Sequence, residues 1–338
     1  TSMNRYLMIA AVTGIMGLDP GAGFAAEKVT VDSFVRAETD MTLDRYVRQG
    51  ALGKLIHIRM PVPIDRQDVI RMNRDTLYSA GVFDLSAPVT IVKPETGGRF
   101  QSMLVINQDH SMLPAEHGAG EFTFTQEKMG TRYMIVLFRT FVDSNDPTDI
   151  KAANALQDKI VVKQAAPGKF EIPEWDEASL KKVRDAINVL AATRTSAKGM
   201  FGDKAKLDPI SHLLGTAFGW GGNPEEAAIY DNVVPAENDG KTPHSVTVKD
   251  VPVDGFWSIT VYNKDGFMEK NDQNVYSHNN VTAKKNQDGS VTIHFGAGTD
   301  ALNNVPITPG WNYIVRMYQP RKEIIDGTWK FPVAQPTK

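Results

Sequence analysis

Hydrophobic and polar residues alternate along two stretches of the chain, with the period of two that is typical of β-strands. In residues 76–142, short runs rich in β-branched and aromatic residues are separated by Gly- and Pro-containing turn signals. The runs are residues 77–83, 89–92, 100–106, 122–124 and 133–142. Regular short strands joined by turns predict an antiparallel sheet or sandwich.

The second β-rich stretch begins at residue 245, and its strongest runs are residues 246–248, 256–262, 291–295 and 313–318. Asn263-Lys264-Asp265-Gly266 and Asn286-Gln287-Asp288-Gly289 have the composition of hairpin turns. A second antiparallel block is therefore expected.

Helical patterns precede the first β block and separate it from the second. The spacing predicts helices over residues 30–51, 148–162 and 209–218, and a further helix capped by Asp176. The apolar stripe of that capped helix comprises Leu180, Val183, Ile187 and Leu190. Asn223 followed by Pro224 predicts the start of one more helix.

This order of elements predicts an α+β, β-rich fold with two antiparallel β-sandwich-like (jelly-roll-like) domains and a helical segment between them. We place an N-terminal helix plus β domain at residues 27–165, a helical connecting region at 166–240 and a C-terminal β domain at 241–338.

Residues 1–26 have the pattern of a targeting segment. Thr1 and Ser2 are typical of an expression-tag scar, and Met3 begins a short start with one cation followed by an apolar run over residues 6–18. Gly23 and Ala25 place small residues at a cleavage site, which predicts a signal peptide and a periplasmic or secreted protein. The alternative is a buried or amphipathic N-terminal helix. The run is shorter than the roughly 20 residues of a membrane span, so no stable membrane insertion is expected after removal of the leader.

Charge and cysteine content exclude several classes of function. The 338 residues carry 37 Lys and Arg against 40 Asp and Glu, a formal net charge of −3, so no global positive field attracts nucleic acid. The absence of cysteine removes thiol nucleophiles, disulfides, zinc–thiolate sites and iron–sulfur clusters. No G-x-S-x-G, H-E-x-x-H or phosphate-loop motif is present, and the sequence indicates no cofactor and no metal.

Two polar segments are candidates for a site. Asn73, Arg74, Asp75 and Tyr78 lie at the entry to a predicted strand and together offer an amide, a cation, an anion and a phenol for binding a ligand. The alternative is local structure, with Asp75 paired to an arginine and Asn73 shaping the turn.

The second segment follows the strand predicted over residues 100–106. It contains Gln108, a predicted ligand-binding residue, and Asp109, His110 and His117, which are the catalytic candidates if the protein is an enzyme. Histidine titrates near neutral pH and a carboxylate fixes its tautomer, so these residues suit acid–base chemistry. Metal ligation and purely structural hydrogen bonding are the alternatives.

Four further ligand-binding candidates lie inside predicted strands. Arg139 and Arg316 are cations at strand positions, where an arginine facing a cleft can hold a carboxylate, sugar or phosphate; the alternative is a solvated face. Trp257 and Tyr262 belong to an aromatic-rich C-terminal block that would suit sugar stacking, although most such aromatics are core residues.

The chain resembles a pair of bacterial families. Asn73-Arg74-Asp75-Thr76-Leu77-Tyr78-Ser79 with Phe83-Asp84-Leu85 resembles domain-of-unknown-function family 1254. The run from Asp254 to Asn263, Pro309-Gly310-Trp311-Asn312-Tyr313 and Arg316-Met317-Tyr318-Gln319-Pro320 resemble family 1214. The resemblance implies two β-rich, sandwich-like domains, often in exported proteins, and implies no established reaction.

Three functions follow as hypotheses. The first is an exported protein that binds a small polar ligand or a glycan between its β domains. The second is a hydrolase or lyase that uses the Asp and His residues as acid–base groups with Arg74 or Arg139 as an electrostatic clamp. The third is an oligomeric assembly protein. Titration with ligands tests the first, convergence of the site residues in one pocket tests the second, and light scattering tests the third. The expected partners are a small ligand or glycan and a second copy of the chain.

Overall fold

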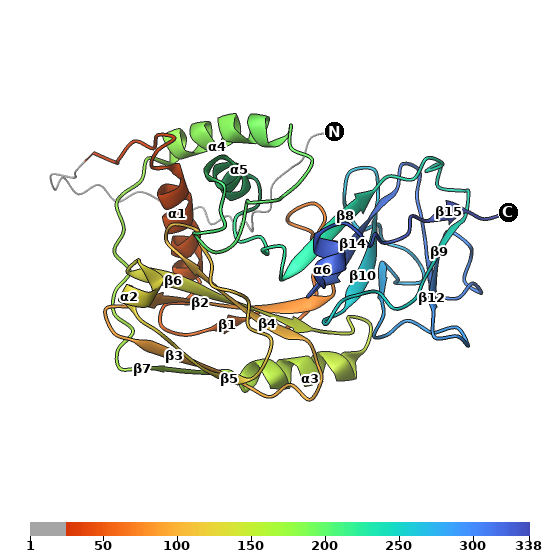
Figure 1. Ribbon diagram of the computed structural model, residues 1–338, viewed down its shortest axis with the longest axis horizontal. Coiled ribbons are helices and arrows are strands. Elements are labelled where there is room, and N and C mark those ends of the chain that lie inside the picture. Colours follow the sequence, from red (N-terminus) through yellow and green to blue (C-terminus); the bar gives the residue numbers. More distant parts are fainter. Residues whose placement is uncertain (1–24) are drawn as a thin grey trace.

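The computed structural model describes residues 25–338, and the chain folds into helices and antiparallel sheets (Figure 1). The predicted α+β, strand-rich class is confirmed, whereas the sandwich or jelly-roll arrangement stays a prediction. The predicted signal peptide lies almost wholly outside the described residues. Within residues 25–338, no helix is both long and apolar enough to cross a bilayer.

Two antiparallel sheets pack together in the N-terminal half. One has the order β1 (Ile56–His57), β2 (Thr76–Asp84), β6 (Tyr133–Phe141), β4 (Gln101–Asn107); the other has β5 (Gly120–Phe124), β3 (Val89–Lys93), β7 (Val161–Gln164). Phe83, Met103 and Phe138 of the first sheet pack against Ile91 and Phe124 of the second. The alternation in the sequence predicted every one of these strands except β1 and β7.

Helices cover the other face of the β2–β6–β4 sheet. Leu43 of α1 (Phe34–Arg48) packs against Ala80, Leu137 and Leu104, which pair in register across β2, β6 and β4. The helices α4 (Glu177–Ala191) and α5 (Pro209–Gly219) pack onto α1, while α2 (Gln126–Met129) and α3 (Pro147–Asp158) lie at the ends of the sheets (Figure 1). The helical layer therefore lies on the same face of the sheet as Tyr78 and Arg139. These two residues are two positions away from Ala80 on β2 and Leu137 on β6, so their side chains point to the same side.

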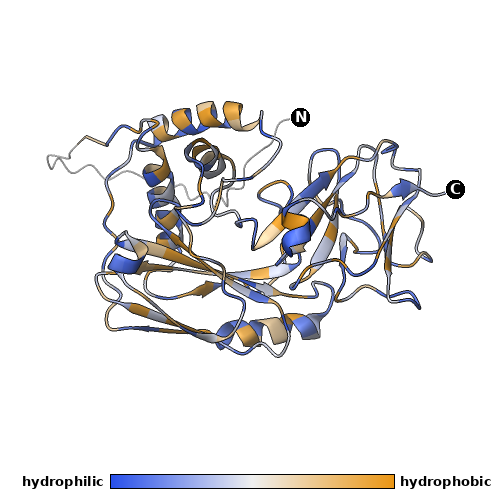
Figure 2. Ribbon diagram, viewed as in Figure 1, coloured by the Kyte–Doolittle hydropathy of each residue, from blue (hydrophilic) through white to orange (hydrophobic). Residues whose placement is uncertain are grey.

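The predicted Asp176 cap is confirmed, because its carboxylate accepts a hydrogen bond from the Ser179 amide at 2.9 Å. Hydrophobic and hydrophilic positions alternate along α4 (Figure 2). Leu180 and Ile187 are buried as predicted, but Leu190 is 60% exposed. The helix predicted from Asn223 is wrong: a turn follows Pro224 and strand β8 (Ala228–Val233) begins directly after it.

The C-terminal half contains two four-stranded sheets. The first has the order β11 (Ser277–Asn279), β10 (Trp257–Tyr262), β14 (Asn312–Tyr318), β8. The second has the order β13 (Asn304–Val305), β12 (Val291–Phe295), β9 (His244–Val248), β15 (Gln335–Pro336). All strand pairs are antiparallel except the short β12–β13 pair, and a single helical turn, α6 (Lys322–Ile325), follows β14. Trp257, Phe295 and Tyr313 belong to the core between the sheets.

Candidate functional site

Strand alternation gives the β10–β14–β8 sheet one apolar and one polar face. On β10, Trp257, Ile259 and Val261 enter the C-terminal core, so Ser258, Thr260 and Tyr262 face the opposite way. Ser258 pairs in register with Arg316, and Arg316 pairs with Tyr230 of β8. A row of hydroxyl and guanidinium groups therefore crosses three strands on the face that is turned away from the core.

A matching row crosses the N-terminal sheet. Tyr78 of β2 pairs in register with Arg139 of β6, and Arg139 pairs with Ser102 of β4. Residues paired in register share a face, and this is the face covered further along by α1. The phenol, guanidinium and hydroxyl groups thus form a polar end to a surface whose centre is apolar.

The loop before β2 joins the two rows. The Ser258 hydroxyl donates to the buried Asp75 carboxylate at 2.6 Å, and the Arg316 Nη2 donates to the Arg71 carbonyl at 2.8 Å. The Tyr262 hydroxyl donates to the Met72 carbonyl at 2.6 Å. In Figure 1 this loop, drawn in orange, lies beside β8.

Six side chains at this junction shift one another's pKa values through their charges. We call this group of side chains the central polar cluster. Its members are Asp75, Tyr78, Arg139, Tyr230, Arg316 and Tyr318.

Replacing Ser258 with alanine is expected to lower the free energy of unfolding by about 2 kcal/mol, because the buried Asp75 carboxylate loses its hydroxyl donor. Urea denaturation of the variant measures the change. Thr247→Ala is the matched control, because the exposed Thr247 hydroxyl contacts only the Thr292 hydroxyl. A Ser258→Ala loss no larger than that of the control would show that the Ser258–Asp75 bond does not hold the two halves together.

The two arginines of the cluster differ in their hydrogen bonds. Arg316 donates to the Thr260 hydroxyl at 3.2 Å and to the Tyr262 hydroxyl at 2.9 Å, in addition to the Arg71 carbonyl. Arg139 is 8% exposed, and its Nη1 atom is buried without any hydrogen-bond partner. Arg316 therefore fastens the loop to the sheet, whereas Arg139 has an unused donor.

Tyr78 is a neighbour of Arg139 on the adjacent strand. The guanidinium carbon lies 5.4 Å from the centre of the Tyr78 ring. Burial raises the pKa of Tyr78, but the positive charge of Arg139 and hydrogen bonding from Asn73 and Arg139 outweigh burial and lower the pKa below its ordinary value. Such a phenol loses its proton more readily than an ordinary tyrosine.

The other two tyrosines of the cluster are shifted in the opposite direction. Burial raises the pKa of Tyr230, even though Arg139 and a hydrogen bond from Asn223 oppose the shift. Burial and the nearby Asp75 carboxylate raise the pKa of Tyr318 well above its ordinary value. Burial likewise raises the pKa of Asp75, against the charge of Arg316 and the bond from Ser258.

Two asparagines support the phenols in the same way. The Asn73 Nδ2 donates to the Tyr78 hydroxyl at 3.4 Å, and the Asn223 Nδ2 donates to the Tyr230 hydroxyl at 2.8 Å. An amide nitrogen can only donate, so each phenol oxygen is the acceptor in its pair.

The remaining ligand-binding candidates make structural contacts. Arg74 donates to the Val62 carbonyl and lies over the Tyr276 ring, with 5.8 Å from guanidinium carbon to ring centre. Trp257 is buried in the C-terminal core against Phe331. Of the ligand-binding candidates, the structure therefore brings Asn73, Asp75, Tyr78, Arg139, Tyr262 and Arg316 together, and leaves Arg74, Trp257 and Gln108 outside.

The segment that follows β4 contacts α1 and α5. The Gln108 Nε2 donates to the Asp40 carboxylate of α1 at 2.8 Å, and Asp109 forms an exposed ion pair with Arg36 at 2.6 Å. His117 lies level with Ser102 at the start of β4, whereas His110 follows Asn107 at its end. Five strand residues separate those levels, roughly 16 Å at about 3.3 Å per residue, so the structure does not bring the three catalytic candidates together.

Both ring nitrogens of His110 are occupied. Its Nε2 accepts from the Gly221 amide at 2.8 Å, so Nδ1 carries the proton and donates to the Thr216 hydroxyl at 2.7 Å. The ring is fully buried, and burial together with the neighbouring His212 keeps its pKa well below the ordinary value. His110 thus anchors the turn that leads to Asn223, the support of Tyr230.

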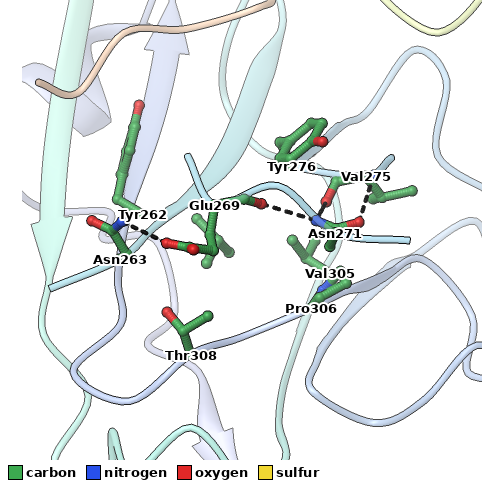
Figure 3. Close-up of a pocket in the computed structure, with 10 residues that line it drawn as sticks. Tyr262, Asn263, Glu269, Asn271, Val275, Tyr276, Val305, Pro306 and Thr308 are labelled. Atoms are coloured by element: carbon green, nitrogen blue, oxygen red, sulfur yellow. Dashed lines mark hydrogen bonds between the residues drawn. The ribbon is translucent and has the colours of Figure 1, made fainter. Parts of the chain in front are cut away.

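Two cavities lie in the C-terminal half, and none of the six side chains of the central polar cluster lines either of them. The pocket in Figure 3 has a volume of about 10 Å³, enough for one water, and its Asn263 and Glu269 side chains bond to each other at 2.7 Å. A cavity of about 190 Å³ is lined by Trp257, Lys249 and Lys285, among others. In the described part of the chain, no group of three His, Asp or Glu side chains is placed to hold a metal ion.

The sequence prediction missed Tyr230, Tyr318, Asn223 and Ser258. Tyr230 and Asn223 lie where a helix was predicted, so their strand and turn positions were hidden. Ser258 and Tyr318 belong to the runs that resemble family 1214, and the alternation along β10 and β14 is the signal that could have placed them with Arg316.

Comparison with known proteins gives two family matches. Residues 52–164 match the family described as protein of unknown function DUF1254, and residues 232–322 match the one described as protein of unknown function DUF1214. The order of the two matches confirms the resemblance predicted from the sequence. No curated protein matches the chain.

Two solved structures are similar to this chain, and the first has a related fold. The VPA0106 protein from Vibrio parahaemolyticus is 19% identical, with a TM-score of 0.67 over 91% of this chain and 98% of that chain. An uncharacterised protein from Burkholderia cenocepacia is 12% identical, with a TM-score of 0.49 over 90% of this chain and 87% of that one. The first likeness extends to the whole fold of the Vibrio protein, and at this identity it is evidence for the fold alone.

Proposed function

We propose that this chain, which contains a DUF1254 domain followed by a DUF1214 domain, binds a small organic anion between its two halves at Arg139, Tyr78 and Tyr230. The single observation that carries the proposal is the buried, unpartnered Nη1 of Arg139. A buried donor without a partner costs on the order of 1–3 kcal/mol, and more when the group is charged. A ligand that accepts from this atom removes that cost.

The charge balance of the central polar cluster favours an anion. The cluster has two guanidinium groups and one carboxylate. Asp75 already accepts from Ser258 and lies in the field of Arg316, and no carboxylate is among the groups that shift the pKa of Arg139. A desolvated cation attracts a negative charge strongly, because little water screens it.

The surrounding donors favour a carboxylate ligand. The Tyr230 hydroxyl keeps a proton to donate, and the guanidinium group offers its unpartnered Nη1. A carboxylate can accept from Nη1, and its remaining lone pairs can accept from the Tyr230 hydroxyl. Acidic sugars and small carboxylic acids both present this group.

Isothermal titration with D-galacturonate, malate and the neutral sugar galactose tests the proposal. We expect the two carboxylates to bind and galactose to give no heat, because only the carboxylates offer an anion to Arg139. Equal binding of galactose, or no binding of either carboxylate, would contradict the proposal.

Export to the periplasm and assembly into a homo-oligomer stay predictions. Signal-peptide cleavage in cells tests the first, and light scattering tests the second.

A further inference from the structure

We infer, resting on the proposed anion site, that Tyr78 and Tyr230 are the base and the acid of an elimination reaction on a carboxylate that bears an oxygen substituent on its β-carbon. The substrate class is then either a glycan of uronic acids or a small β-hydroxy acid, which share this arrangement of groups. The protein would be a lyase.

Both phenols belong to the central polar cluster, and the guanidinium carbon of Arg139 lies 5.4 Å from the centre of the Tyr78 ring. Tyr78 comes from β2 of the N-terminal half and Tyr230 from β8 of the C-terminal half, and the charge of Arg139 acts on both. Each phenol is held by an asparagine of its own half. A carboxylate on Arg139 would therefore have its α- and β-carbons between two groups that can exchange protons.

The environments of the two phenols suit opposite tasks. The Tyr78 oxygen is stabilised as an anion by Arg139 and the Asn73 amide, so its pKa is lowered. Burial of the Tyr230 hydroxyl raises its pKa, so that group keeps its proton. Titratable groups whose pKa values are pushed apart at one site are the usual sign of a base and an acid.

The reaction balances with these groups alone. The Tyr78 phenolate takes the proton from the α-carbon, and Arg139 stabilises the charge that develops on the carboxylate. The electron pair of the broken C–H bond becomes the new carbon–carbon double bond. The bond from the β-carbon to oxygen breaks with its electron pair, and the departing oxygen takes the Tyr230 proton. Transfer of one proton from Tyr78 to Tyr230 through solvent restores the Tyr78 phenolate and the Tyr230 phenol, and no oxidant, metal or protein nucleophile is required.

Exposure is compatible with a ligand that reaches the site from solvent. Tyr230 is 46% exposed although burial of its hydroxyl raises its pKa, and Tyr78 is partly exposed. Arg139 is 8% exposed. The phenols are thus the more exposed groups of the site and the guanidinium the more buried one.

The test incubates the full chain with polygalacturonate, alginate and malate, and follows the ultraviolet absorbance and the olefinic proton resonances of the product. Release of unsaturated uronic acids identifies a glycan substrate, whereas fumarate identifies a small hydroxy acid. At saturating substrate, kcat is expected to rise with pH as Tyr78 loses its proton.

Tyr78→Phe removes the base and leaves Arg139 in place, so we expect turnover to fall by about 100-fold or more while carboxylate binding persists. Tyr313→Phe is the matched control, because that hydroxyl accepts from the Ala334 amide in the C-terminal core, and its turnover should match the parent. Tyr230→Phe is expected to lose turnover on substrates with poor leaving groups.

The outcomes separate the two proposals. Carboxylate binding without any unsaturated product would overturn the lyase inference and leave the proposed function intact. Turnover by Tyr78→Phe at the parental rate, with an unchanged pH profile, would also overturn it. Absence of both binding and product would overturn the proposed function and the inference together.

Discussion

Arg139→Met is expected to weaken binding of D-galacturonate or malate by about 100-fold or more, a loss of roughly 2.7 kcal/mol of binding free energy. The variant removes the only charge that the proposed site offers to a carboxylate from the N-terminal sheet, and it removes the unpartnered Nη1 donor. Hydrogen bonds to charged groups contribute more than neutral ones, particularly where water is excluded. Isothermal titration of variant and parent measures the change.

The same substitution is expected to leave the free energy of unfolding unchanged or to raise it by about 1–2 kcal/mol. Arg139 is 8% exposed and has an unsatisfied donor, and replacing a poorly compensated buried ion by an apolar side chain of similar length is often neutral or stabilising. A gain in stability with a loss of binding is the signature of a functional residue rather than a structural one. The pKa of Tyr78 should rise at the same time, because the charge that lowers it is gone.

Arg48→Met is the control for Arg139→Met. Arg48 is exposed on α1 and pairs only with Asp44, so its loss should change neither binding nor stability by more than a few tenths of a kcal/mol. If Arg139→Met bound carboxylates as tightly as the parent, Arg139 would not be the anion-binding group. If it unfolded the protein, its contact with the Tyr78 ring would be structural.

His110→Leu is expected to lower the free energy of unfolding by about 3 kcal/mol at pH 7.5. The substitution leaves the Gly221 amide buried without an acceptor and disturbs the stack in which His110 lies 5.0 Å from the Trp220 ring. The loss measures how strongly the loop after β4 holds the turn at the end of α5. Denaturation by urea gives the value.

The pH dependence of stability distinguishes a buried neutral histidine from a catalytic one. The folded pKa of His110 lies well below its unfolded value near 6.5, so the unfolded chain binds a proton first as the pH falls. Stability from this residue is complete above pH 6.5 and is lost at lower pH, by about 2 kcal/mol at pH 5. His117, whose pKa is lowered to about 4 by burial and by Lys93, contributes in the same direction.

His110→Leu should therefore lose about 2 kcal/mol less stability than the parent between pH 7.5 and pH 5. Thr216→Val is the matched control: it removes the acceptor of Nδ1 but keeps the ring, so the pH dependence should persist with a smaller loss at pH 7.5. A parental pH dependence in His110→Leu would show that another group causes the acid sensitivity. Loss of turnover without loss of stability would instead favour an acid–base role for His110.

Much of the secondary structure could be predicted from the sequence. Alternation along residues 77–83 and 133–142 defined β2 and β6, and Asp176 with its downstream stripe defined α4. These signals are local, because strand pleating and helix capping depend on neighbours a few residues apart. The turn at Pro224 shows the limit: a local helix start signal was overridden when residues 228–233 paired with β14.

The sequence by itself determined that no cysteine chemistry is available and that Arg139 and Arg316 lie in strands. It also supplied Asn73, Asp75 and Tyr78 as neighbours along the chain. The tertiary structure decided which arginine keeps an unused donor, because the partners of Arg316 come from β10 and the loop before β2, far from it in sequence. It also decided which groups His110 bonds to, since α5 supplies Thr216 and Gly221 lies just after it. The alternation of a strand fixes which face a side chain occupies, but only long-range packing fixes what it meets there.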